Sequence, residues 1–310
     1  MENNENETKL KKMLNLLWLR PENALLDVYK SNIFSDFKFE SPSLDLSCGD
    51  GLFMFLHLGG ELDQNFDYFQ STKAKEFKHD SFVDIYDDCK KEYSVDVTKP
   101  AKQKIDYGSD WKEGLLNKAS KLGIYNQTIL HDNNNLPLPF KDNELKTIYS
   151  NSIYWVNDIN AILKDINRIL KPGGIAGLEV MTPYFLETLG KLKSVFSKEA
   201  IDILDRKRSE TMPCNLTYSE WKDLFIQNGF KIKEVRNVYP NKLLLDIWNV
   251  GLRPISHLLI QMSDSLSEEK RAKIKEEWVD IFFKLLKPLL SMEKNYSLED
   301  SPYLMFILEK

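Results

Sequence analysis

Apolar residues follow two different spacings along the first 180 residues of the chain. Short, continuously apolar segments predict buried strands, whereas apolar residues three and four positions apart predict amphipathic helices. The predicted strands are Ser43–Leu46, Gln103–Tyr107, Thr128–Leu130, Lys146–Tyr149 and Ile175–Met181. The clearest helices are Trp111–Leu122 and Asp158–Leu170, the second of which ends at Lys171-Pro172-Gly173-Gly174. Strands that alternate with helices predict a parallel sheet covered by helices on both faces.

The pattern changes on either side of this region. Residues 1–40 predict an N-terminal helical segment, and residues 41–182 predict the core, with an insertion at about 60–103 that mixes aromatic and charged residues without a sustained period. Residues 183–310 predict helical cap insertions plus the last two strands of the core sheet, Phe230–Val238 and Tyr303–Leu308. We therefore expect one α/β fold with inserted helices.

Composition narrows the class of protein. The chain has 310 residues, 42% hydrophobic residues and a net charge of −5, which excludes dominant disorder and disfavours wholesale nucleic-acid binding. Three cysteines in a long chain indicate a reducing compartment. The most apolar stretch, Leu243–Ile260, is too polar for stable membrane insertion, so a soluble, cytoplasmic protein is expected.

Polar residues follow three successive strands. Residues 44–51 read LDLSCGDG, in which a glycine-rich turn joins a strand to a helix and allows a ligand to approach the backbone closely. Asp110 follows the next strand, where a carboxylate can accept both hydroxyls of a ribose, and Asp132 follows the third, where it can accept the amine of adenine. The carboxyl ends of parallel strands form one edge, so these residues predict a nucleoside site.

Four segments together resemble a known family. They are LDLSCGDG, IDYGSDWKEGLLNKASKLG, HDNNNLPLPFKDN and WVNDINAILKDINRILKPGG, and in this order they are similar to class I S-adenosylmethionine-dependent methyltransferases, in the type 11-like branch that acts on small molecules. The resemblance covers residues 43–181 well and residues 218–238 and 303–310 more loosely. It implies a Rossmann-like, seven-stranded, mostly parallel sheet whose last strand is antiparallel, and S-adenosylmethionine as cofactor.

The resemblance also implies roles for individual residues. Asp110 would hold the ribose, Trp111 would lie against the adenine, and Ser150 would lie near the methionine moiety and the reacting methyl group. The resemblance further implies that the turn after the first strand holds the methionine part of the cofactor and that the end of the third strand contacts the edge of the adenine. The remaining residues implied in cofactor binding are Asp45, Ser47, Gly49, Asp50, Gly51, Asp132 and Asn133.

Three features depart from the family pattern. Ser47 stands where a glycine is usual, and Lys146 stands where an aspartate is usual. The gap between Gly51 and Asp110 is long, which makes Asp63 a rival ribose ligand; we favour Asp110 because a helix with a buried stripe follows it directly.

No clear general base is visible. Three candidates for catalysis are His131, beside Asp132; His79, in the insertion; and Tyr154, where substrates enter in this fold, although aromatic packing explains Tyr154 equally well. A packing role is expected for His57, and the basic run Arg206–Arg208 is either a solvated helix face or a contact for an anionic group. The cysteines lack zinc-like spacing, so no metal is expected.

These features predict methyl transfer by in-line displacement to oxygen or nitrogen of a small metabolite, such as a sugar or a secondary-metabolite scaffold. The expected partner is this small-molecule substrate, with no nucleic acid, and the protein is expected to be a monomer or homodimer. Two rivals stay open: a non-catalytic S-adenosylmethionine-binding regulator or scaffold, and a different nucleotide enzyme such as a dehydrogenase.

Overall fold

The computed structural model describes residues 2–71, 93–187, 195–205, 212–239, 242–292 and 297–310. His79 and the run Arg206–Arg208 lie outside these residues. Within the described ranges, no helix combines the length and the apolarity that crossing a membrane requires.

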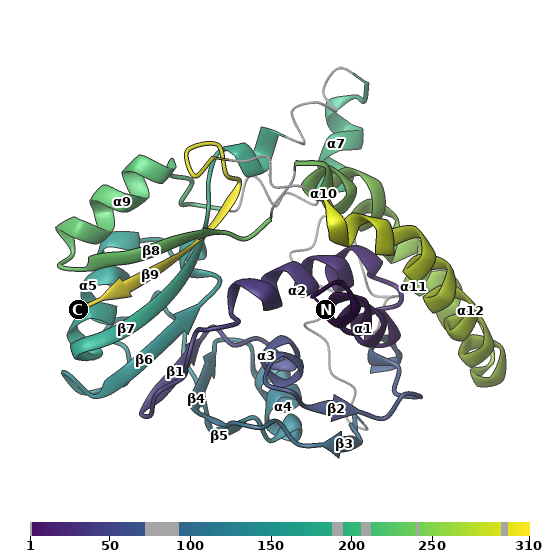
Figure 1. The fold of residues 1–310 in the computed structure, drawn as a ribbon, viewed down its shortest axis with the longest axis horizontal. Helices are drawn as coiled ribbons and strands as arrows, with labels where there is room; N and C mark the ends of the chain where they lie inside the picture. Colours follow the sequence, from purple (N-terminus) through teal and green to yellow (C-terminus); the bar gives the residue numbers. More distant parts are fainter. Residues whose placement is uncertain (1, 72–92, 188–194, 206–211, 240–241, 293–296) are drawn as a thin grey trace.

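Seven strands form one sheet in the order β5-β4-β1-β6-β7-β9-β8 (Figure 1). Their bounds are β1 (Ser43–Leu46), β4 (Ile105–Asp110), β5 (Tyr125–Leu130), β6 (Leu145–Ser150), β7 (Leu170–Met181), β8 (Lys231–Asn237) and β9 (Tyr303–Glu309). Neighbouring strands from β5 to β7 pair in parallel, whereas β9 runs antiparallel to both β7 and β8. The expected Rossmann-like sheet, with its antiparallel last strand, is confirmed.

Helices cover both faces of the sheet (Figure 1). One face carries α2 (Pro21–Ile33), α3 (Leu52–His57) and α4 (Glu113–Leu122), and the other carries α5 (Ile159–Ile169) and α9 (Tyr218–Gln227). The Asp158 side chain caps α5 by accepting a hydrogen bond from the Ala161 N–H at 2.9 Å, and the four inward apolar residues of α5 are fully buried. The remaining helices are α1 (Glu2–Leu16), α7 (Lys198–Asp205), α10 (Lys242–Asp246), α11 (Ser256–Asp264) and α12 (Glu268–Leu286), with short helical turns η4 (Ile247–Leu252), η5 (Arg253–Ile255) and η6 (Lys287–Ser291). They lie on the side of the molecule that carries α2, with α1 and η4 in contact with α2 and α7 farther from it.

Several strand boundaries differ from the predicted ones, among them the end of β4 and the starts of β5 and β7. Gly108 to Asp110 belong to β4 itself, so Asp110 is the last residue of that strand. The Lys171–Gly174 segment ends helix α5 as expected but continues as the start of β7, because the Gly173 N–H donates to the Lys310 carbonyl at 2.9 Å and the Lys310 N–H donates to the Gly174 carbonyl at 3.1 Å.

The predicted insertion contains a second, small sheet. It consists of β2 (Glu61–Leu62) and β3 (Val97–Lys99), with the 3₁₀ turn η1 (Tyr68–Ser71) after β2. A further 3₁₀ turn, η3 (Ile153–Trp155), follows β6.

Candidate active site

The turn after β1 is joined to the end of β4 by hydrogen bonds. The Cys48 N–H donates to the Ser109 carbonyl at 2.8 Å, and the Gly49 N–H donates to Oδ2 of Asp110 at 3.0 Å. The other oxygen of Asp110 accepts from the Lys112 N–H at 2.9 Å. A carboxylate can accept about four hydrogen bonds, so Asp110 retains capacity for a further donor. The structure thus places a carboxylate against the glycine turn, as the sequence predicts.

Asp110 is only 7% exposed. Burial raises the pKa of its carboxyl, and the hydrogen bonds from the Lys112 and Gly49 N–H groups oppose that effect. Asp63, the rival residue, lies elsewhere: it follows β2 in the small sheet, where its side chain accepts from the Asn65 N–H at 2.7 Å. Asp110 ends the strand that pairs with β1, and Asp63 does not.

Ser47 adopts the left-handed backbone conformation that its expected glycine would favour. Its φ is +64°, a conformation that costs a non-glycine residue about 1–2 kcal/mol. The Ser47 hydroxyl accepts a hydrogen bond from Nδ2 of Asn133 at 2.9 Å. The serine therefore ties the turn after β1 to the loop after β5, a link that a glycine could not make.

The two glycines of the turn have different surroundings: Gly49 borders open space, whereas Gly51 is tightly packed. Gly49 has φ of +60°, and a Cβ added there would meet nothing within 4 Å. Gly51 has φ of +72°, and its Cβ would approach Cε2 of Tyr125 to 3.0 Å. Asp50 closes the turn by accepting hydrogen bonds from the Leu52 N–H and from the Tyr68 hydroxyl.

Asp45 is a buried residue of β1, just before the turn. It is 2% exposed and accepts a hydrogen bond from the Tyr125 hydroxyl at 2.6 Å. Burial raises the pKa of Asp45 to about 7, and the bond from Tyr125 opposes that rise. The Tyr125 ring reaches Asp45 across Gly108, where a Cβ would come within 2.7 Å of the ring. Gly108 is therefore required by this close approach.

Two large apolar side chains are exposed beside Asp110. Trp111 is 62% exposed, and Leu130, which pairs with Asp110 in the sheet, is 60% exposed. Exposed apolar side chains next to a carboxylate and an open glycine turn fit a nucleoside, whose base is apolar on its faces and whose sugar donates hydrogen bonds. Leu130 is not among the residues predicted for the site; its place as the last residue of a predicted strand was the available signal in the sequence.

The residues after Leu130 form a tight loop. The His131 N–H donates to the Asp110 carbonyl at 3.0 Å, and Nε2 of His131 is buried without a hydrogen-bond partner among the described residues. Oδ1 of Asp132 accepts from the N–H and the side-chain amide of Asn134, at 2.9 and 3.1 Å. One oxygen of the Asp132 carboxylate is thus engaged within its own loop, whereas the Asn133 side chain reaches the turn after β1.

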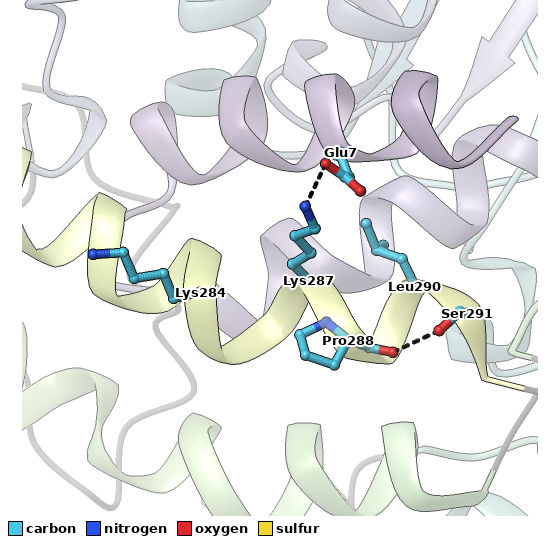
Figure 2. A pocket seen from close by; sticks show the side chains of 6 residues that line it. All are labelled: Glu7, Lys284, Lys287, Pro288, Leu290 and Ser291. Carbon is cyan, nitrogen blue, oxygen red and sulfur yellow. Dashed lines mark hydrogen bonds and ion pairs between the residues drawn. The ribbon is translucent and has the colours of Figure 1, made fainter. Parts of the chain in front are cut away.

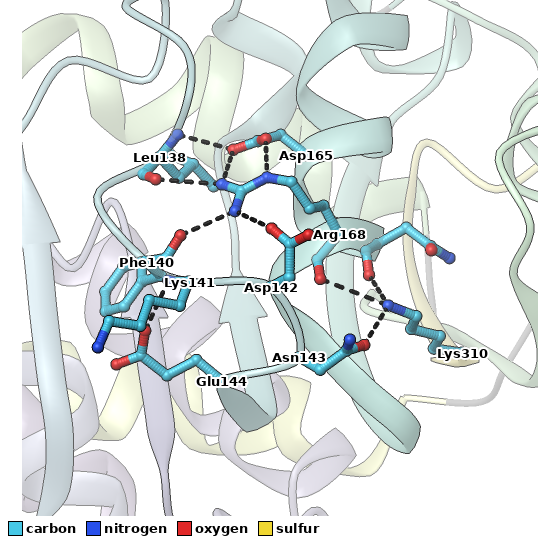
Figure 3. A network of polar contacts seen from close by, with 10 residues as sticks. Leu138, Phe140, Lys141, Asp142, Asn143, Glu144, Asp165, Arg168 and Lys310 are labelled. Atoms are coloured by element: carbon cyan, nitrogen blue, oxygen red, sulfur yellow. Dashed lines mark hydrogen bonds and ion pairs between the residues drawn. The ribbon is translucent and has the colours of Figure 1, made fainter.

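An arginine holds the next part of this loop (Figure 3). The Arg168 guanidinium donates to the carbonyls of Leu138 and Phe140, at 3.2 and 2.8 Å, and to the carboxylates of Asp142 and Asp165. Oδ2 of Asp165 also accepts from the Leu138 N–H at 2.7 Å. The side-chain hydrogen bond to Asp165 is the main reason that the pKa of Arg168 is raised.

The remaining predicted residues lie around the end of β6. Ser150 is fully buried as the last residue of that strand, and Tyr154, 4% exposed, packs edge-on against the Tyr303 ring at 6.3 Å. Lys146 lies near the opposite end of β6, where its Nζ donates to the Gly173 carbonyl at 2.8 Å. The reversed charge at Lys146 therefore lies away from the strand ends that form the site.

His57 is packed as expected: its Nδ1 lies 3.0 Å from the Ser31 hydroxyl, and burial lowers the pKa of His57 to about 4. The part of the chain that the structure describes contains no group of three metal-ligating side chains.

A separate pocket of about 300 Å³ lies on the helical side of the molecule (Figure 2). It is lined by Glu7 of α1 together with residues of α12 and η6, and Lys287 pairs with Glu7 at 2.9 Å. None of its lining residues belongs to the strand ends, so we assign it no part in the site described above.

Residues 95–178 match the family described as a methyltransferase domain. No curated protein matches the sequence. Among solved structures, the chain is similar to an S-adenosylmethionine-dependent methyltransferase of Thermotoga maritima, described as a possible histamine N-methyltransferase, with 14% identity, a TM-score of 0.47 and coverage of 92% of this chain and 89% of that one. It is also similar to an S-adenosylmethionine-dependent methyltransferase of Mesorhizobium loti, with 13% identity, a TM-score of 0.47 and coverage of 92% and 98%. A third is phosphoethanolamine N-methyltransferase 2 of Haemonchus contortus in complex with S-adenosylmethionine, with 16% identity, a TM-score of 0.45 and coverage of 92% and 52%.

Proposed function

We propose that this chain, a class I S-adenosylmethionine-dependent methyltransferase by its sheet order and by the domain that residues 95–178 match, methylates an oxygen or nitrogen atom of a small metabolite. The family resemblance found in the sequence is confirmed, and S-adenosylmethionine is the cofactor. The acceptor belongs to the proposal, with a sugar or a secondary-metabolite scaffold as the kind of molecule first expected. A cytoplasmic location is also part of it, supported by the free thiols of Cys48 and Cys214.

The observation that carries the proposal is the contact between Asp110 and the Gly49 N–H. It brings the carboxylate that would accept the ribose hydroxyls to the turn that would hold the methionine part. Trp111 and Leu130 would cover the faces of the adenine, and Asp132 with Asn133 would contact its edge. Ser150 would lie near the methyl group, at the end of the central strand β6.

The cofactor supplies an activated methyl group on a positively charged sulfur. The residues of this chain bind the adenosyl part at one place along the strand ends and keep the acceptor aligned with the bond that breaks. Such alignment contributes about 7 kcal/mol or more to rate enhancement in favourable cases.

Calorimetry with S-adenosylhomocysteine tests the assignment of Asp110. We expect Asp110→Ala to weaken binding at least about tenfold, because the ribose hydroxyls lose a charged acceptor worth about 1.5–3 kcal/mol. Asp63→Ala is the matched control and should leave the affinity within about twofold. Equal loss in both variants, or loss only in Asp63→Ala, would assign the ribose to a different carboxylate.

A second measurement separates an enzyme from a binding protein. The wild-type protein is incubated with S-adenosylmethionine and a deproteinised metabolite extract, and release of S-adenosylhomocysteine is measured by mass spectrometry. We expect release that depends on the extract. Tight cofactor binding without any release would favour the regulatory alternative.

A further inference from the structure

A buried glutamate lies at the strand ends and is not used by the cofactor site described above. Glu179 of β7 is fully buried, and its Oε1 accepts a hydrogen bond from the Tyr149 hydroxyl at 2.7 Å. Leu178 pairs with Ser150, the last residue of β6, so Glu179 lies one residue beyond the end of the neighbouring strand β6. Successive residues alternate between the faces of a strand, and the bond to Tyr149 places Glu179 on the face that α2 covers.

The second oxygen of Glu179 is incompletely paired. Oε2 accepts no hydrogen bond among the described residues and lies 3.4 Å from Nζ of Lys30 on α2. The Lys30 ammonium itself lies over the Phe53 ring, 4.7 Å from its centre. Buried carboxylate oxygens normally have hydrogen-bond partners, because an unsatisfied one costs free energy. Glu179 therefore has unused capacity to accept a donor.

A second carboxylate lies on the same side of α2. Asp27 is three residues before Lys30 and one helical turn after Asn23, whose side chain accepts a hydrogen bond from the Trp248 indole at 2.7 Å. Burial raises the pKa of Asp27 to about 7, the charges of Lys30 and Arg20 oppose that rise, and those of Asp50 and Glu179 add to it.

The negative and positive side-chain charges around Glu179 and Asp27 do not balance. Arg20 forms a buried ion pair with Glu22, and Lys30 lies against Glu179. Both cations also act on Asp27, so the three carboxylates of Glu22, Asp27 and Glu179 share two cations. The excess is negative, and it lies between the β1 turn, which carries Asp50, and the end of β7. A cation bound here would offset it, whereas a neutral hydroxyl would not.

Aromatic rings line the same end of the sheet. Tyr303 pairs with Met181 at the start of β9, and its ring packs against those of Tyr154 and Tyr239, with centres 6.3 and 5.5 Å away. Its hydroxyl donates to the Asn151 carbonyl, beyond the end of β6, at 3.3 Å. Ring faces attract cations, so these tyrosines add to the preference for a positive ligand.

We propose that the methyl acceptor is a protonated amine, whose ammonium group binds between Glu179 and Asp27 beside the aromatic rings. The proposal rests on the methyltransferase function and specifies its acceptor class. The ammonium first gives one proton to the Asp27 carboxylate, which becomes neutral. The nitrogen lone pair then forms the new N–CH₃ bond while the S–CH₃ bond breaks, its electron pair stays on sulfur, and the positive charge moves from sulfur to the methylated nitrogen.

Sinefungin is the probe for this subsite. It resembles S-adenosylhomocysteine, but it carries a primary amine where the transferred methyl group would be, so its extra ammonium points toward the acceptor. Binding of sinefungin and of S-adenosylhomocysteine to the full chain is compared by calorimetry at pH 8. We expect the wild-type protein to bind sinefungin at least about tenfold more tightly.

The variants Glu179→Gln and Asp27→Asn should each lose most of that preference. We expect about a tenfold loss of sinefungin affinity and less than about a threefold change for S-adenosylhomocysteine. Glu276→Gln, an exposed position on α12, is the matched control and should change neither affinity. A cooperative thermal unfolding transition like that of the wild type shows that a variant is folded, and each of the two variants tests the subsite independently of the other.

Three results would overturn the inference. The first is equal affinity of the wild type for the two ligands, and the second is an unchanged preference for sinefungin in both variants. The third is an equal loss of affinity for both ligands in a folded variant, which would indicate that the carboxylates bind the amino group of the cofactor itself. Failure of the wild type to bind either ligand would instead contradict the proposed function.

Discussion

At the scale of single residues, the position that departs most clearly from the family pattern carries an additional contact. Ser47 has a strained, left-handed backbone conformation, and its hydroxyl accepts a hydrogen bond from Asn133. A neutral hydrogen bond contributes about 0.5–1.5 kcal/mol, which is close to the strain of about 1–2 kcal/mol. The substitution of glycine by serine is therefore nearly balanced in energy, and it gives the β1 turn a direct connection to the β5 loop.

Two substitutions separate these contributions. Ser47→Gly should change the free energy of unfolding by less than about 1 kcal/mol, because strain and hydrogen bond are lost together. Asn133→Ala removes only the hydrogen bond and should destabilise the protein by about 1 kcal/mol. Urea unfolding of both variants checks this; a larger loss in Ser47→Gly than in Asn133→Ala would contradict it.

The raised pKa of Asp27 predicts a pH-dependent stability. Between about pH 4 and its folded-state pKa of about 7, the native state keeps a proton that the unfolded chain has lost. Stability from this group is therefore greatest below pH 4 and is lost as the pH rises to about 7. Asp27→Asn should be more stable than wild type at pH 8, on the order of 2 kcal/mol, and equal to it near pH 4.

Denaturant unfolding at both pH values measures this difference. Asp280→Asn, an exposed carboxylate on α12, controls for the general effect of removing a negative charge. The same gain for both variants, or a gain for Asp27→Asn at pH 4, would show that Asp27 is not the titrating group.

At the scale of elements, the loop that follows β5 depends on helix α5. Arg168 donates to two backbone carbonyls of the loop and to Asp142, and Asp165 orients it from the preceding turn of the helix (Figure 3). The loop contains two prolines and no regular hydrogen-bonded structure, so these side-chain bonds replace the ladder that a strand would have. Arg168 thereby positions the segment that continues from Asn133.

Removal of this side chain should loosen the loop. We expect Arg168→Ala to lower the free energy of unfolding by about 2–3 kcal/mol, because charged hydrogen bonds to buried carbonyls are lost, and to speed amide exchange at residues 138–142. Lys164→Ala, an exposed position on the same helix, should do neither. Hydrogen-exchange mass spectrometry shows the local effect, and unchanged exchange in the loop would count against the assigned role.

At the scale of the whole molecule, segments far apart in the chain meet at one buried carboxylate. Asp67, beside η1, accepts hydrogen bonds from the Trp18 indole at 3.2 Å and from Nε of Arg271 on α12 at 2.6 Å. Lys275, one turn later on α12, donates to the Phe66 carbonyl at 2.7 Å. The N-terminal helices, the insertion and the C-terminal helices are thus held together by one network.

Asp67→Ala should therefore be severely destabilising. It breaks the buried pair between Arg271 and Asp67 and leaves Arg271 only its contact with the less buried Asp264 among the described carboxylates; breaking a buried pair costs about 3–5 kcal/mol. Asp280→Ala breaks the exposed pair with Lys11 on the same helix and should cost less than about 1 kcal/mol. Thermal unfolding compares the two, and similar melting temperatures would refute the assigned role of Asp67.

The alternation of apolar segments and helical stripes was sufficient to predict a parallel sheet covered by helices, whereas the seven strands and the antiparallel last strand were implied by the family resemblance. Periodicity is local, so residues 43–46 and 158–170 show their structure in the sequence alone. It also placed Asp110 after a strand and predicted that this carboxylate lies near the glycine turn. The matched family covers residues 95–178, which include Asp110 and the helix at 158–170 but not the first strand and its glycine turn.

Only the tertiary structure could place Glu179, Asp27 and Leu130. Glu179 is one acidic residue inside an apolar strand, and nothing near it in sequence indicates that Lys30, almost 150 residues earlier, lies 3.4 Å away. Leu130 is distinguished by exposure, which depends on what packs around it. The sequence by itself determined the order of elements, because that depends on short-range patterns, and its resemblance to a known family implied the cofactor. The charges and rings around Glu179 were decided by contacts between distant elements, which no local pattern encodes.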